Sequence, residues 1–135
     1  MNDKAIVAEF FRCLGSDNDA AGLAALISAD ALVETHFSPE GQLTRFDGRD
    51  QILARFAGVR YTMASFGFHD IEVYATDRAG ELFATCTSSG THVDGRHYAN
   101  GYCWQFRIVD GQIAYWREFY DPQKVVPFIE DIAIG

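Results

Sequence analysis

The stretch that decides the fold runs from Tyr102 to Asp121 and reads YCWQFRIVDGQIAYWREFYD. Apolar and polar residues alternate on both sides of Asp110-Gly111, a dipeptide that is typical of tight turns between antiparallel strands. The pattern therefore predicts a β-hairpin that buries one face and exposes the other.

The rest of the chain divides into a helical first half and a second half made of strands. Apolar residues recur at helical spacing near the N-terminus, where Asp3 is the candidate N-cap, and again over two later segments. Helices are expected at residues 3–14, at residues 20–27 and after residue 50, with a short strand at residues 31–37. Further strands are expected at residues 68–76, 82–93, 96–109 and 112–120. This order predicts an α+β domain in which helices cover one face of a curved antiparallel sheet.

Composition limits the classes of protein to which the chain can belong. The 135 residues suit one domain over residues 1–135, and a hydrophobic fraction of 48% excludes a disordered chain. A net charge of -8 argues against nucleic acid or an anionic membrane as a partner, because both favour basic surfaces. Three cysteines without framework spacing suit a reducing compartment, and no stretch reads as a membrane span or signal peptide. We therefore expect a cytoplasmic protein.

The hairpin at residues 102–121 resembles the closing hairpin of SnoaL-like proteins, in the nuclear transport factor 2-like superfamily. The shared pattern is Phe-Arg-Ile, Asp-Gly, Ile and then Trp-Arg-acid-aromatic-aromatic-Asp. Ala29-Asp30, the segment at residues 46–50 and the opening helix resemble the same family. The resemblance implies a cone-shaped barrel, in which three N-terminal helices pack on a strongly curved antiparallel sheet and close a deep pocket. Relatives include polyketide cyclases, limonene epoxide hydrolase, scytalone dehydratase, ketosteroid isomerase, phenazine-biosynthesis A/B proteins and non-catalytic binding modules, so the site must be argued from residues.

Two forms of the turn at Asp110-Gly111 lead to two different pockets. A two-residue turn sets Glu118 opposite Cys103, whereas a turn with a bulge at Gly111 sets Glu118 opposite Tyr102 and on the face of Trp104. We favour the bulged form, because it gathers the large apolar side chains of both strands on one face.

A two-residue turn at Asp94-Gly95 then fixes the preceding strand. It sets Cys86 opposite Cys103, as reduced thiols on the outer face, and places threonines on the inner face. The two turns together predict a ligand-binding set made of Thr85, Thr87, Tyr98, Asn100, Tyr102, Trp104, Trp116 and Tyr120.

Glu118 is the first candidate catalytic residue. Among aromatic side chains its carboxyl loses water contacts, which raises its pKa toward the range useful for proton transfer. The resemblance points to the same residue, because the matching position in the epoxide hydrolase, the polyketide cyclase and the phenazine proteins holds the working acid or base. The alternative is a solvated edge carboxylate that pairs with Arg107 or Arg117.

Histidines supply the remaining candidates. His36, at the end of the first strand, is the second candidate catalytic residue, opposite Glu118, and the alternative is a surface histidine. His92 and His97 are expected to face each other across the hairpin. Two histidines make an incomplete zinc site, so no metal is predicted.

Departures from the family pattern argue against one reaction. The Arg and Asp that complete the triad of limonene epoxide hydrolase match Thr85 and Thr87, and its water-orienting Tyr and Asn match Val33 and Thr35. Threonine cannot stabilise charge as arginine does, so epoxide hydrolysis by that triad is not expected.

These observations predict a small enzyme, needing no cofactor, that moves a proton on a largely apolar organic molecule. Isomerisation, cyclisation, dehydration or hydrolysis would fit, with Glu118 as acid or base and Tyr98, Tyr102 or His36 as hydrogen-bonding partners. The alternative is a non-catalytic small-molecule-binding or dimerisation module of the same fold. A homodimer is expected through the outer face of the sheet, where an apolar patch would otherwise be exposed by Cys103, Val109, Tyr115 and Phe119.

Overall fold

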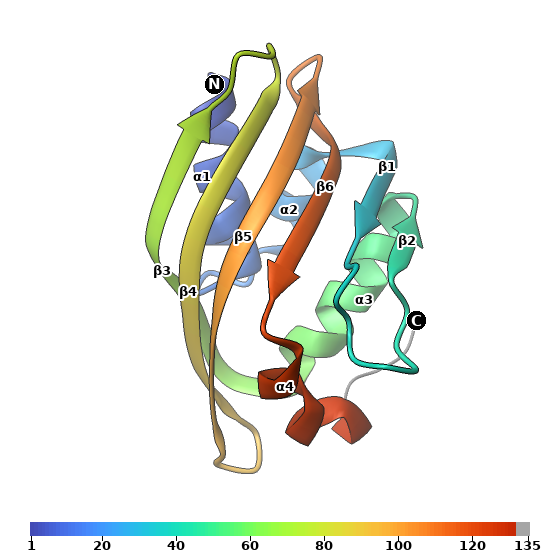
Figure 1. The fold of residues 1–135 in the computed structure, drawn as a ribbon, viewed down its shortest axis with the longest axis vertical. Coiled ribbons are helices and arrows are strands. Elements are labelled where there is room, and N and C mark those ends of the chain that lie inside the picture. Colours follow the sequence, from blue (N-terminus) through green and yellow to red (C-terminus); the bar gives the residue numbers. More distant parts are fainter. Residues whose placement is uncertain (132–135) are drawn as a thin grey trace.

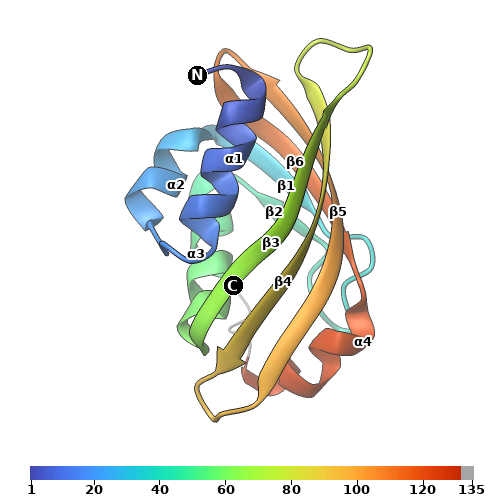
Figure 2. The same cartoon turned by 90° about the vertical axis from the view of Figure 1, so that its left-hand side faces the viewer.

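A computed structural model describes residues 1–131 as a curved six-stranded sheet with helices packed against one face (Figures 1 and 2). The helices are α1 (Asp3–Leu14), α2 (Ala20–Leu26), α3 (Arg49–Tyr61), α4 (Pro122–Val125) and the 3-10 helix η1 (Val126–Asp131). The strands are β1 (Ile27–Glu34), β2 (Arg45–Asp47), β3 (Met63–Ala75), β4 (Glu81–His92), β5 (His97–Val109) and β6 (Gln112–Tyr120). The predicted α+β architecture is confirmed. No helix in these residues is long and apolar enough to cross a membrane.

The strand order is β2-β1-β6-β5-β4-β3, and it corrects two details of the expected sheet. First, β1 runs parallel to β6, whereas all other neighbours are antiparallel, so the sheet is mixed. Parallel neighbours require a long crossover, which the chain from β2 to β5 supplies. Second, within residues 1–131 the sheet stays open, with β2 and β3 as its edges, and does not close into a barrel.

Helix α1 fixes the core on the inner face of the sheet. Its N-cap is Asn2 rather than Asp3, because the Asn2 side chain accepts a hydrogen bond from the backbone N–H of Ala5 at 2.8 Å. Phe10 and Phe11 then pack edge-on against Trp104, with ring centroids 5.7 Å and 5.3 Å apart. This aromatic cluster fills the space under α1, so the cavity described below lies beyond its C-terminal end.

The turn between β5 and β6 takes the two-residue form rather than the bulged one. Asp110 and Gly111 both have positive φ, 51° and 77°, as this type of tight turn requires. A β-bulge farther along leaves Ala114 unpaired and shifts the register, so that Trp104 faces Glu118. The predicted pairing of Glu118 with Tyr102 is therefore wrong by two residues, although the predicted face is the observed one.

The turn between β4 and β5 has three residues rather than two. The backbone N–H of His92 donates to the Arg96 carbonyl at 2.7 Å, and the N–H of Gly95 donates to the His92 carbonyl at 2.9 Å. Gly95 has φ 94°, which glycine adopts without steric cost in such a loop. His97 consequently pairs with Thr91, and the expected pairing of His92 with His97 is wrong.

This extra loop residue reverses the two faces of β4. Cys86 pairs with Tyr102, and Thr85 pairs with Cys103, so the predicted pairing of the two cysteines is wrong. The Cys86 thiol is buried and accepts a hydrogen bond from the indole N–H of Trp104 at 3.3 Å, whereas Cys103 lies on the outer face. Both remain free thiols.

Candidate active site

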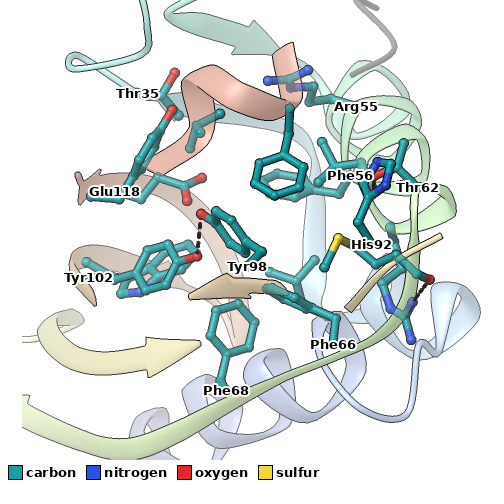
Figure 3. A pocket seen from close by; sticks show the side chains of 18 of the residues that line it. Thr35, Arg55, Phe56, Thr62, Phe66, Phe68, His92, Tyr98, Tyr102 and Glu118 are labelled. Carbon is teal, nitrogen blue, oxygen red and sulfur yellow. Dashed lines mark hydrogen bonds between the residues drawn. The ribbon is translucent and has the colours of Figure 1, made fainter. Parts of the chain in front are cut away.

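A cavity of about 140 Å³ lies between α3, the inner face of the sheet and the segment that follows β6. Figure 3 shows the side chains around it, which come from both halves of the chain. About half of the residues that line it are aromatic, and they include Phe46, Phe56, Phe66, Phe68, Trp104 and Phe128. Such a wall suits an apolar ligand held by a few polar groups.

Glu118, on β6, places its carboxyl group in this cavity. Its side chain points toward Tyr98 (Figure 3), and only 6% of the residue is exposed. Burial raises the pKa of Glu118 to about 7, although the indole N–H of Trp116 and the guanidinium of Arg55 lower it. Within the described residues, the Trp116 indole N–H makes no hydrogen bond of regular geometry. The carboxyl can therefore be protonated or ionised near neutral pH.

Asn100 sets the direction of the hydrogen bonds beside Glu118. Its Oδ1 accepts from the backbone N–H groups of Gly101 at 2.9 Å and Asp121 at 3.1 Å. Its Nδ2 is therefore the atom that donates to the Tyr98 hydroxyl, at 2.9 Å. Because the Tyr98 oxygen accepts this bond, its own proton is directed toward the Tyr102 hydroxyl, 3.3 Å away, or into the cavity.

The two phenols on β5 are hydrogen-bond donors rather than acids. Burial raises the pKa of both Tyr98 and Tyr102, so both keep their protons at neutral pH. The Tyr102 hydroxyl lies 2.9 Å from Ser88 Oγ, which becomes an inner-face group through the observed register of β4. A buried phenol that keeps its proton can donate it to a ligand oxygen in the cavity.

A second polar group lies at the junction of β1 and β6. Thr35 is buried and lines the cavity, and its hydroxyl donates to the Leu43 carbonyl at 3.3 Å. Ser38 donates to the Thr35 hydroxyl at 2.7 Å and lies 3.3 Å from the hydroxyl of Tyr120. These bonds hold the Tyr120 ring in the cavity wall.

The segment after β6 covers the side of the cavity that lies near the β4–β5 turn. Phe128 packs against His92 and Tyr98, with ring centroids 5.3 Å and 5.6 Å apart. Arg96 holds the segment in place, because Nη1 donates to the Pro127 carbonyl at 2.8 Å and the guanidinium lies 4.4 Å from the Phe128 ring centre. His92 itself lines the cavity, with Nδ1 2.9 Å from a carboxylate oxygen of Asp94.

Half of the predicted ligand-binding residues line the cavity, namely Tyr98, Tyr102, Trp104 and Tyr120. Asn100 and Trp116 are buried beside the cavity: Asn100 donates a hydrogen bond to Tyr98, and Trp116 lowers the pKa of Glu118. Thr85 and Thr87 do not belong to the site: both are exposed on the outer face, because the three-residue loop reverses β4.

His36 does not reach Glu118. Strand β1 ends at Glu34, and the chain then turns outward, where the His36 ring stacks on Phe119 with centroids 6.2 Å apart. Its Nε2 lies 3.7 Å from a carboxylate oxygen of Glu34, and 42% of the side chain is exposed. His36 is thus a surface histidine, and its expected role as a second catalytic residue in the cavity is wrong.

Helix α3 contributes residues to the cavity that lie outside the predicted ligand-binding set. Arg55, Phe56 and Arg60 all line the cavity. Their signal is weak, because an arginine on a helix is typical of a solvated surface. Arg60 follows Phe56 by four residues, which places both on one face of the helix, and this spacing was the signal that could have revealed Arg60.

Comparisons with known proteins agree with this architecture. A family model described as a SnoaL-like domain matches residues 7–116. An uncharacterized PhzA/B-like protein from Pseudomonas aeruginosa is 31% identical over 127 residues, which cover 92% of this chain and 87% of that protein.

Two solved structures show the same fold at low sequence identity. One, from Bacillus subtilis and provisionally named an isomerase, superposes with a TM-score of 0.84 at 20% identity and full coverage of both chains. Another, from Pseudomonas putida and provisionally named a polyketide cyclase, has a TM-score of 0.80 at 18% identity, covering 98% of this chain and 99% of that one. Together with the family model, these matches show that the chain belongs to the family of SnoaL-like domains.

Proposed function

We propose that this protein is a small acid–base enzyme, needing no cofactor, that moves a proton on a largely apolar organic molecule. The observation that carries the proposal is the burial of the Glu118 carboxyl in an aromatic cavity, where its pKa is about 7. A group that is half ionised at the working pH serves equally well as base and acid.

The chemistry that these groups support is proton abstraction next to a carbonyl. Glu118 takes a proton from the carbon, the electron pair of that C–H bond forms a carbon–carbon double bond, and the π electrons of the carbonyl group move onto its oxygen to give an enolate. Tyr98 donates a hydrogen bond to that oxygen, in the direction that Asn100 sets. Return of the proton to the γ-carbon of a β,γ-unsaturated ketone completes an isomerisation. Attack of the enolate carbon on a second carbonyl group of the same molecule, whose oxygen takes the proton from Glu118, completes a cyclisation.

The size of the cavity limits the part of the substrate that it encloses. An apolar cavity of about 150 Å³ holds one benzene molecule, and this cavity has a similar volume of about 140 Å³. The ligand is therefore a one-ring molecule, or a larger molecule that places one ring inside.

The alternative is a binding module that performs no catalysis. It is favoured by the position of His36, because no second acid–base group from β1 faces Glu118. A binding module needs the aromatic cavity but does not need the carboxyl to titrate.

Exchange of carbon-bound hydrogen with D₂O distinguishes these two functions. Full-length protein is incubated with a panel of one-ring ketones, and deuterium incorporation is followed by mass spectrometry. The proposal predicts incorporation for at least one ketone, and a loss of about 10² to 10⁴ in rate for Glu118→Gln, with ketone binding retained. Glu34→Gln is the matched control, because it removes a carboxylate that accepts a hydrogen bond from Tyr115. This variant should catalyse deuterium exchange at the wild-type rate. Binding of ketones without exchange above the background rate would favour the binding module.

The proposal extends to assembly and location. Val109 is exposed, and Cys103, Tyr115 and Phe119 share the outer face with it, which supports a homodimer through this face. Three free thiols support a reducing compartment such as the cytoplasm.

A further inference from the structure

Two guanidinium groups of α3 line the cavity that holds Glu118. Arg55 lies over the Phe46 ring, with its guanidinium carbon 5.5 Å from the ring centre. Arg60 is anchored by its Nη1, which donates to the Met63 carbonyl at 2.9 Å. The Nε of Arg60 is buried and has no hydrogen-bond partner among the described residues. A buried N–H without a partner costs free energy that a ligand oxygen can recover.

The charge of these groups contrasts with that of the whole chain. The net charge is -8, yet among the described residues that line the cavity Arg55 and Arg60 are cationic and Glu118 has the only carboxyl group. Glu118 is only half ionised near neutral pH, and desolvation lowers the pKa of Arg55. The buried Nε–H of Arg60 belongs to a charged guanidinium, so an anionic ligand oxygen satisfies it better than a neutral one does.

We propose that the ligand is a small organic acid of one-ring size, whose carboxylate is held at the α3 side of the cavity by Arg60 with Arg55. The planar guanidinium fork matches a carboxylate, and the aromatic wall takes the ring. This inference names the ligand class of the site and rests on the same cavity that serves the proposed function.

A bound carboxylate is coupled to the ionisation of Glu118. Within the described residues, the titratable or charged side chains that interact with Glu118 or line the same cavity are Arg55 and Arg60 from α3, Cys86 and His92 from β4, Tyr98 and Tyr102 from β5 and Tyr120 from β6. Burial raises the pKa of the thiol and of the three phenols, so these four groups stay neutral. A carboxylate ligand therefore binds more tightly as the pH falls and Glu118 takes up a proton, and Glu118→Gln removes this part of the dependence.

Matched pairs of acids and amides test the proposal directly. Benzoate and benzamide, phenylacetate and phenylacetamide, and cyclohexanecarboxylate and its amide are titrated into the full-length protein by NMR. The expected result is that at least one acid binds at millimolar or lower concentration, about tenfold more tightly than its amide. Equal binding of acid and amide in every pair, or no binding of any acid, would overturn the proposal.

Variants on α3 assign the preference to the cavity. Arg60→Gln should bring the ratio of acid to amide affinity close to one, and Arg60→Lys should keep part of it while preserving a donor for Met63. Arg55→Gln gives a second test if Arg60→Gln lowers the stability too far. Arg49→Gln is the matched control: Arg49 lies on the same helix and donates to the Ile27 carbonyl at 3.3 Å, but it does not line the cavity. An equal loss of preference in Arg49→Gln would overturn the assignment to the cavity.

The Glu118→Gln variant separates this inference from the proposed function. Retained preference for acids with lost deuterium exchange supports both. An acid preference in a protein that shows no exchange supports the anionic ligand and contradicts the enzyme. Exchange of neutral ketones without any acid preference supports the enzyme and contradicts the anionic ligand.

Discussion

Glu118 and Trp104 face each other directly across the β5–β6 pair, so a carboxyl group and an indole ring share the inner face of the sheet. The relationship depends on the bulge at Ala114. With the two-residue turn at residues 110–111 and no bulge, Glu118 would face Cys103 and its carboxyl would point outward. One extra residue in β6 thus places the candidate catalytic group in the cavity.

Burial of Glu118 makes the free energy of unfolding depend on pH. The pKa is about 7 in the folded protein against 4.5 for the unperturbed group, so between these values the folded state holds more protons than the unfolded state. The contribution of Glu118 to the free energy of unfolding is therefore fully present below about pH 4.5. It is lost as the pH rises through about 7, and the total loss is on the order of 3 kcal/mol. Urea unfolding of wild type and Glu118→Gln at about pH 5 and pH 8 measures the difference. The same pH dependence in both proteins would show that Glu118 is not desolvated.

The fold was largely predictable because its signals are local. Asp110-Gly111 and the alternating residues around it identify the hairpin of β5 and β6, and apolar spacing identifies α1 and α3. Strand β2 was not predicted, since three residues at a sheet edge carry no periodic pattern. Its pairing with β1 is a tertiary contact that no local spacing encodes.

The site was only partly predictable from the sequence. Which side chains of a strand point into the cavity depends on the register between strands, and the register depends on the length of the turn. Asp94-Gly95 and Asp110-Gly111 look alike in sequence but form loops of different length. At the first, the Asp94 side chain accepts from the Arg96 backbone N–H at 3.0 Å and contacts His92, which stabilises the three-residue loop. That difference moved Thr85 and Thr87 out of the site.

Tyr98 is expected to stabilise the transition state more than the bound ligand. Tyr98→Phe removes the hydroxyl that accepts from Asn100 and should slow deuterium exchange by about 10² to 10³, with ligand affinity changed much less. Tyr74→Phe, on the exposed side of β3, is the control with the same chemical change. Exchange at the wild-type rate in Tyr98→Phe would exclude the hydroxyl from the reaction.

Arg96 is expected to control how readily ligand enters the cavity. Arg96→Ala removes the bond to the Pro127 carbonyl and the contact with Phe128, so the segment at residues 122–129 should lose protection in amide hydrogen exchange. Ligand association and dissociation should both become faster. Arg78→Ala, at the β3–β4 turn, is an exposed control. Unchanged protection of this segment in Arg96→Ala would show that Arg96 does not hold it.

The outer face of the sheet is expected to join two copies of the chain. Val109 is 50% exposed, so Val109→Asp adds a charge to this face without disturbing the core. Sedimentation velocity at micromolar concentration should show a dimer for wild type and a monomer for the variant. A wild-type monomer under these conditions would contradict the homodimer.

The most direct test of the account is a carbon-13 NMR titration of the glutamate side-chain carboxyls in the unliganded protein. Comparison with Glu118→Gln assigns the resonance of Glu118, because only that signal disappears. The account predicts that this carboxyl titrates with a midpoint of about 7. A midpoint near the unperturbed value of 4.5 would mean that the carboxyl is solvated, and would contradict its role as the proton-transfer group.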